Sequence, residues 1–168
     1  MIRIEIKDGE LLKAIRTIIQ HAENPRPLMV GIGEILVEST KQRFKSGTAP
    51  DGSRWVGNSE TTILNFLSRY RSSFRKDGRL NKKGAARAAS KKPLIGESRR
   101  LSSTIAYRAD RDSVTVGSPL PQAAMMHFGG NKSDFPHLWG DIPARPFLGL
   151  SIDDEDGILD LVENLLTP

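Results

Sequence analysis

The sequence predicts an α+β fold, in which a small, mainly antiparallel sheet packs against about three helices. Two observations indicate this class. Apolar residues recur at helical spacing in three separate stretches, and two runs rich in Ser, Thr, Val and Ile flank a turn-forming tetrapeptide, as in a β-hairpin. Because the chain has 168 residues and no internal repeat, we expect a single domain over residues 1–168.

The N-terminal part is expected to form a strand and then two helices. Residues 2–6 alternate between isoleucine and charged residues, which is the pattern of a half-buried strand. Apolar side chains follow at helical spacing over residues 11–22, and Pro25 interrupts this run. A second amphipathic helix is expected over residues 27–46, with Gly47 as its C-terminal stop.

A tight turn is expected at Pro50-Asp51-Gly52, because proline fixes φ and glycine tolerates a positive φ. Trp55 follows this turn on a predicted loop. Two interpretations of Trp55 stay open. It either caps the core beneath the loop or serves as an interface anchor, since tryptophan is enriched among binding hot spots.

The middle of the chain carries most of the positive charge. Residues 69–100 hold twelve basic and two acidic residues, a net charge of +10; the whole chain has +5, so the remainder has −5. The part at about 69–92 follows a short predicted helix around residues 63–67. It is polar, alanine-rich and interrupted by glycines, which predicts a long, flexible basic loop that orders on assembly. The expected basic patch consists of Lys82, Lys83, Lys91, Lys92, Arg99 and Arg100.

Beyond residue 93 the pattern predicts a hairpin and a last helix. Residues 103–107 and 113–117 are the expected strands, and residues 109–112 form the turn between them. Ser151 or Asp153 can cap the last helix, whose first turn is acidic and therefore well placed against the helix dipole.

The most distinctive pattern lies between the hairpin and the last helix. It begins with Met125-Met126-His127-Phe128-Gly129-Gly130 and ends with Ile142-Pro143-Ala144-Arg145-Pro146-Phe147-Leu148-Gly149-Leu150. Each proline favours extended geometry in the residue before it and cannot donate to a sheet ladder. We therefore expect an exposed, Pro-rich extended arm outside the core. The expected partner-binding residues are Arg145, Phe147, Leu148, Trp55 and Phe128.

No pattern in the sequence predicts catalysis, a cofactor or a metal site. The histidines lack the i, i+4 spacing of a zinc protease helix. His127, Asp134, His137 and Asp141 could in principle surround a metal, but a structural hydrogen bond made by His127 is the favoured interpretation. The chain has no cysteine, which excludes disulfides. It also has no apolar run of the roughly 20 residues that a membrane span requires.

The order of these motifs resembles that of the phage virion morphogenesis family, which includes tail completion proteins of contractile-tailed temperate phages and Mu-like prophages. Members carry a Pro-Asp-Gly turn and a tryptophan, a basic variable stretch, a Gly-x-Leu-x-x-Ser-Ile-like segment, a hairpin, a His-x-Gly-Gly element and a Pro-Ala-Arg-Pro-Phe-Leu-Gly ending. The same elements occur in this order across residues 30 to 152. One departs from the pattern, because extra residues separate Gly96 from Leu101.

The resemblance implies a non-enzymatic phage structural protein that completes the tail or joins the tail to the head, as part of a ring. It implies tail tube or neck (connector) proteins and further copies of the chain as partners, and a place in the host bacterial cytoplasm during assembly or in the tail or neck of the virion. The alternative is a basic nucleic-acid-binding protein that uses residues 69–100. This segment has only Tyr70 and Phe74 as aromatic residues, whereas single-strand binding surfaces usually interleave aromatic with basic side chains.

Overall fold

A computed structural model describes residues 9, 13, 15, 16, 24–138 and 140–166 of the protein. The strand expected at residues 2–6 lies outside these residues, as does most of the helix expected over 11–22. The elements, in chain order, are α2 (Arg26–Ser46), α3 (Glu60–Ser68), the 3-10 turn η1 (Arg71–Ser73), α4 (Lys82–Ser90), α5 (Arg100–Ser103), β1 (Ala106–Ala109), β2 (Val114–Gly117), α6 (Ala123–Phe128) and α7 (Ile152–Leu166).

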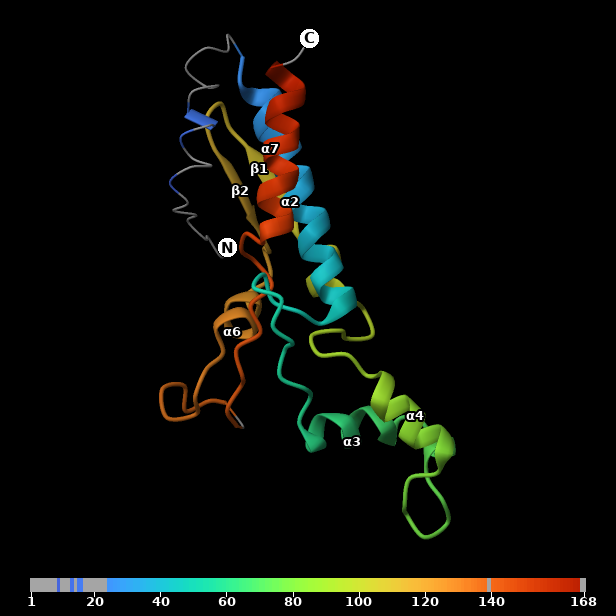
Figure 1. The fold of residues 1–168 in the computed structure, drawn as a ribbon. Helices are drawn as coiled ribbons and strands as arrows, with labels where there is room; N and C mark the ends of the chain where they lie inside the picture. Colours follow the sequence, from blue (N-terminus) through green and yellow to red (C-terminus); the bar gives the residue numbers. More distant parts are fainter. Residues whose placement is uncertain (1–8, 10–12, 14, 17–23, 139, 167–168) are drawn as a thin grey trace.

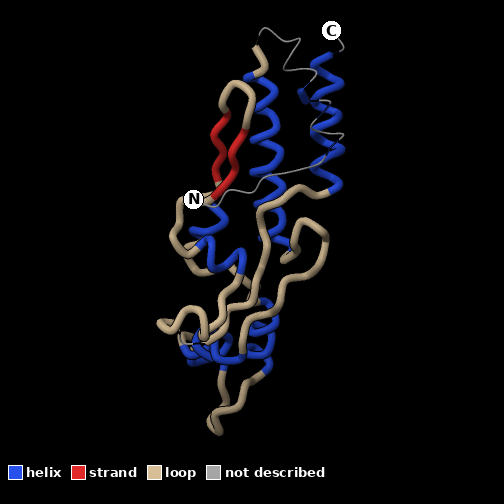
Figure 2. The backbone as a smooth tube through the Cα atoms, turned by 90° about the vertical axis from the view of Figure 1, so that its left-hand side faces the viewer, coloured by secondary structure: helices blue, strands red, loops and turns tan. Residues whose placement is uncertain are grey.

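Helix α2 is the central element of the molecule. It lies between the β1–β2 hairpin and α7 (Figure 2) and contacts both. Its 21 residues end where expected, because Gly47 adopts a left-handed conformation with φ +76° and donates to the carbonyl of Arg43 at 2.7 Å. The helix therefore supplies side chains to every part of the core.

Two apolar clusters form this core. The first joins α2 to α7 and is lined by the hairpin; its buried members are Leu28, Met29, Ile32, Leu36, Ile158 and Val162. The second surrounds the C-terminal end of α2; its buried members are Phe44, Ala49, Trp55, Leu101, Ile105, Ala123, Phe147 and Leu148. The two clusters give the elongated shape seen in Figures 1 and 2, with α3 and α4 projecting beyond the second cluster.

The expected α+β class is confirmed. The described sheet has two antiparallel strands, in which Ala106 pairs with Gly117 and Ala109 with Val114. The expected hairpin therefore forms, although its first strand starts later because residues 100–103 are helical. The helices expected near residues 63–67, 27–46 and at the C-terminus are present, and α4, α5 and α6 are additional.

Residues 69–92 differ from the long loop that was expected, because they contain η1 and α4. The side chain of Asn81 accepts from the Gly84 N–H at 2.9 Å and so caps α4, and the alanines that follow have the highest helix propensity. Arg87 holds α4 against the preceding segment. It donates to the hydroxyls of Ser72 and Ser73 at 3.0 and 2.9 Å, and its guanidinium lies 4.7 Å from the Tyr70 ring centroid.

Candidate functional site

Residues 142–150, here called the strap, enter the core of the molecule, where Arg145, Phe147 and Leu148 are buried. The strap is extended, as its prolines predict. It belongs to no helix or strand and forms one isolated β-bridge, at Ile142. In that bridge Gly130 donates to Ile142 at 2.9 Å and Ile142 donates back at 2.8 Å. The Arg145 N–H then donates to the carbonyl of Met126 at 3.1 Å. The strap is therefore fixed against α6 and the residues that follow it.

The side chain of Phe147 fills the centre of the second core cluster. It is 0% exposed, and its ring centroid lies 5.2 Å from that of Phe44 and 5.0 Å from that of His127. Trp55 completes the group, with an edge-on contact to Phe44 at 5.5 Å. Its indole N–H donates to the carbonyl of Pro146 at 2.7 Å. Trp55 thus caps the core beneath its loop, the first of the two interpretations open from the sequence.

Arg145 is buried and is used inside the chain. Its Nε donates to the carbonyl of Val56 at 2.8 Å, and its Nη2 donates to the carbonyl of Gly57 at 2.7 Å. Burial lowers the pKa of Arg145 below its usual value. The guanidinium ties the strap to the loop that follows Trp55.

Arg43 fastens the other end of the strap. Its Nη1 donates to the carbonyls of Phe147 and Gly149 at 3.2 and 2.9 Å, and its Nη2 forms a buried ion pair with Asp154. Asp154 also accepts from the N–H and the hydroxyl of Ser151 at 2.8 and 2.6 Å. One arginine therefore joins α2, the strap and the first turn of α7.

His127 supports the strap as a hydrogen-bond acceptor. Its Nδ1 accepts from the N–H groups of Phe147 and Leu148 at 3.3 and 3.5 Å, so this nitrogen carries no proton. Burial lowers the pKa of His127 below its usual value of 6.5, which favours the neutral ring that this arrangement needs.

The expectation of an exposed arm is therefore wrong. Arg145, Phe147, Leu148 and Trp55 are all buried, and only Phe128 among the five expected contacts is exposed, at 63%. The prolines correctly indicated an extended chain, which forms a ladder bridge only at Ile142, before the first proline. They could not show that carbonyls and rings from distant parts of the sequence surround it.

The structure does not gather the candidate metal ligands. Among the described residues no group of three or more His, Asp or Glu side chains is placed to hold a metal ion. His127 faces the strap, and Asp141 accepts from the backbone N–H of Lys132 at 2.7 Å.

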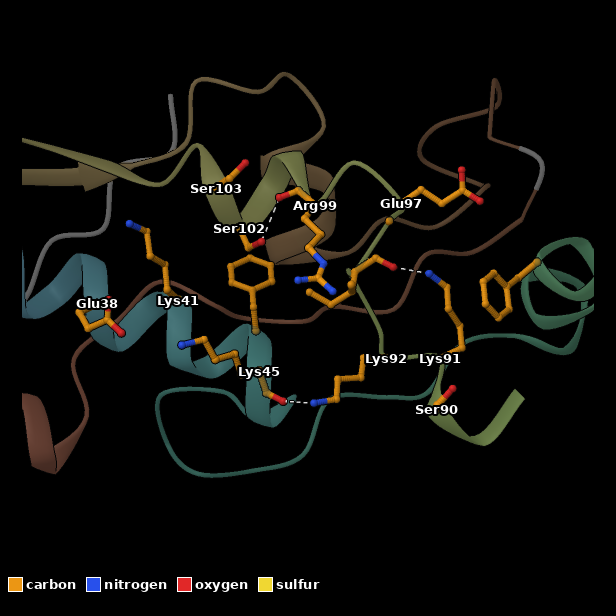
Figure 3. Close-up of a pocket in the computed structure, with 14 residues that line it drawn as sticks. Glu38, Lys41, Lys45, Ser90, Lys91, Lys92, Glu97, Arg99, Ser102 and Ser103 are labelled. Atoms are coloured by element: carbon orange, nitrogen blue, oxygen red, sulfur yellow. Dashed lines mark hydrogen bonds between the residues drawn. The ribbon is translucent and has the colours of Figure 1, made fainter. Parts of the chain in front are cut away.

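The six residues of the expected basic patch lie in three places. Lys82 and Lys83 are exposed on α4, and Arg100 is exposed at the start of α5. The other three members (Lys91, Lys92 and Arg99) line a cleft between α2 and residues 90–103 (Figure 3). Closeness in the sequence therefore did not show which of these basic residues share a surface.

The cleft has a volume of about 740 Å³ and a positive lining. Two lysines of α2, Lys41 and Lys45, join the three basic residues from the facing segment, against the two carboxylates of Glu38 and Glu97. Lys91 and Lys92 donate to the carbonyls of Ile95 and Lys45 and so brace the walls of the cleft. The lining also includes apolar surface of Phe44, Phe66 and Ile95.

Lys41 and Lys45 were not identified from the sequence. A signal was present, because they are spaced i, i+4 on the polar side of a predicted helix and so point in one direction. The sequence gives no indication of which segment faces these lysines, because that segment is more than forty residues away in the chain.

Comparison with known proteins identifies the family of this chain. No significant match was found among curated proteins or among solved structures. None of the helices in the described part of the chain combines the length and apolar character that a membrane span requires. The model of the phage virion morphogenesis family, a family of phage structural and assembly proteins, matches residues 6–167, nearly the whole length. The chain therefore belongs to the phage virion morphogenesis family.

Proposed function

We propose that this protein is a non-enzymatic component that completes a phage tail or joins the tail to the head, as part of a ring. The observation that carries this proposal is the family match over residues 6–167. Its partners would be tail tube or neck proteins and further copies of itself, and it would act in the host cytoplasm during assembly.

The geometry supports a role in binding other proteins through the outer surface. The buried residues of the strap, Arg145, Phe147 and Leu148, contact other parts of the same chain. The strap therefore braces the fold and leaves partner binding to exposed groups. Those groups include Phe128, which is 63% exposed beside the buried His127, and the basic cleft. An oligomeric ring needs two different complementary surfaces on each subunit, which is a heterologous interface.

Contact with DNA is a second, lesser candidate. It is favoured by exposed cations on and beside α4, among them Arg79, Lys82 and Lys83. Helix α4 lies at the end of the molecule away from the hairpin (Figure 1). Such contact would be non-specific, and its affinity would fall steeply with salt because phosphate binding releases counterions.

The test is electron microscopy of particles from an induced lysogen from which this gene has been deleted. We expect full heads beside detached tails or tails with abnormal ends, and restoration of normal particles by the wild-type gene on a plasmid. Normal, infectious virions without the gene would contradict the proposed function. The host must be checked for a second copy of the gene.

A further inference from the structure

The basic cleft carries positive charge that the described part of the chain leaves unpaired. Of its two carboxylates, Glu97 pairs with Arg69 and Glu38 accepts from Gln42. Within the described part of the chain, Lys41, Lys45 and Arg99 form no ion pair. Figure 3 shows Lys41 and Lys45 on α2 and Arg99 on the segment that faces this helix. The cleft therefore favours an occupant that brings its own carboxylates.

The lining indicates a protein segment rather than a nucleic acid. Phe66 and Ile95 are half-buried and provide apolar surface, which a phosphate backbone would not use. A helix that presents acidic side chains next to an apolar one would match both parts of the lining.

The chain itself carries such a helix face. On α7, Asp154 and Ile158 are buried against α2, whereas Asp153, Asp156 and Asp160 are exposed. These three carboxylates recur at i, i+3 and i+7, so they lie on one side of the helix. None of them forms an ion pair with a described residue. Beside them Ile152 is 76% exposed and Leu159 is exposed as well.

We propose that the basic cleft receives the outer face of α7, where Asp153, Asp156 and Asp160 lie beside Ile152, from a second copy of this chain. The two surfaces cannot meet within one chain, because α7 is fixed to α2 through Asp154 and Ile158 and presents its outer face away from α2. The contact is therefore head-to-tail, with a cleft left open at one end and an α7 face left open at the other. This inference rests on the proposed ring assembly and names the surfaces that would build it.

The test uses the purified full chain and light scattering after size-exclusion chromatography at low and high salt. The wild-type protein is expected to associate at low salt and to dissociate at high salt, since ions screen exposed charges. Two charge reversals, Lys41→Glu with Lys45→Glu in the cleft and Asp156→Lys with Asp160→Lys on α7, should each give monomers. The matched control, Lys82→Glu with Lys83→Glu on α4, should associate as the wild type does.

The decisive experiment is to mix the cleft variant with the α7 variant. Each variant keeps one wild-type surface, so an equal mixture should regain association through the intact cleft of one variant and the intact α7 face of the other. A wild-type protein that is monomeric at low salt, or a mixture that stays monomeric, would overturn the proposal. Loss of binding to a DNA duplex in the cleft variant, with association unchanged, would instead assign the cleft to nucleic acid. Since these are measurements on purified protein, their failure would leave the deletion phenotype, and hence the proposed function, to be judged separately.

Discussion

At the scale of single residues, two phenylalanines near the C-terminal motif have opposite roles. Phe147 is 0% exposed between Phe44 and His127, whereas Phe128 is 63% exposed. We predict that Phe147→Ala lowers the free energy of unfolding by about 3–5 kcal/mol, the usual cost of removing a buried phenyl ring. The matched change Phe128→Ala should alter it by less than about 0.5 kcal/mol. Urea unfolding followed by circular dichroism measures the unfolding free energy of both variants. Equally small effects would mean that Phe147 is not buried and that the strap lies on the surface.

The ion pair between Arg43 and Asp154 is a second residue-scale feature with a clear control. Both side chains are buried, at 6% and 3% exposed, so Asp154→Ala would leave the guanidinium without its carboxylate. We predict a loss of about 3–5 kcal/mol of unfolding free energy. The pair of Arg69 and Glu97 is 60% and 61% exposed, and Glu97→Ala should cost less than about 1 kcal/mol. If the two variants proved equally stable, Arg43 would not hold the strap.

His127 predicts a dependence of stability on pH. Because burial lowers its pKa in the folded state below 6.5, the unfolded chain binds a proton more readily as the pH falls through this range. Stability should therefore be highest above pH 6.5 and should decrease as the pH falls toward the folded-state pKa. Unfolding measured from pH 8 to 5 should show a smaller decrease for His127→Gln than for the wild type. Identical pH profiles would mean that His127 is not held neutral by the fold.

At the scale of elements, Gly129 sets the approach of the strap to α6. It has φ +74°, and a Cβ there would lie 2.7 Å from the Ala144 nitrogen and from the Ile142 carbonyl oxygen. Gly78 has a similar φ of +81° but open space around it. We predict that Gly78→Ala costs about 1–2 kcal/mol from the left-handed backbone alone. Gly129→Ala should cost clearly more in thermal unfolding; equal costs would show that the strap and α6 can separate freely.

The elements that the sequence predicted best are those whose signals are local. The helix ending at Gly47, the hairpin and the acidic start of α7 each depend on neighbouring residues. Helix α4 was missed because Gly84 lies in its first turn, where a glycine lowers helix propensity. In the structure this glycine permits close packing, since a Cβ there would lie 2.2 Å from the carbonyl oxygen of Ser73.

The interior position of the strap was missed for a related reason. Its prolines describe its local conformation correctly, but its partners come from far away in the sequence. Arg43 and Trp55 bind strap carbonyls across separations of 104 and 91 residues. Local patterns contain no information on such pairings, and an extended Pro-rich segment with an arginine and a phenylalanine has the same pattern whether it is exposed or buried.

At the scale of the whole molecule, charge is divided between parts of the chain. Residues 69–100 carry +10 and the remainder −5. The fold places some of the positive residues opposite α2 to form the cleft, and it leaves the carboxylates of Asp153, Asp156 and Asp160 on the outer side of α7. A molecule with two complementary surfaces and a braced interior suits assembly from repeated subunits.

The measurement that tests this account most directly is the infectious titre of a lysogen whose gene carries Lys41→Glu with Lys45→Glu. Both lysines lie on the surface of α2 facing the cleft, so the variant should unfold at nearly the wild-type temperature. We predict a large loss of titre with full heads and unjoined or abnormally ended tails, while Lys82→Glu with Lys83→Glu leaves the titre close to normal. A normal titre from the folded cleft variant would contradict the claim that this protein assembles through the cleft.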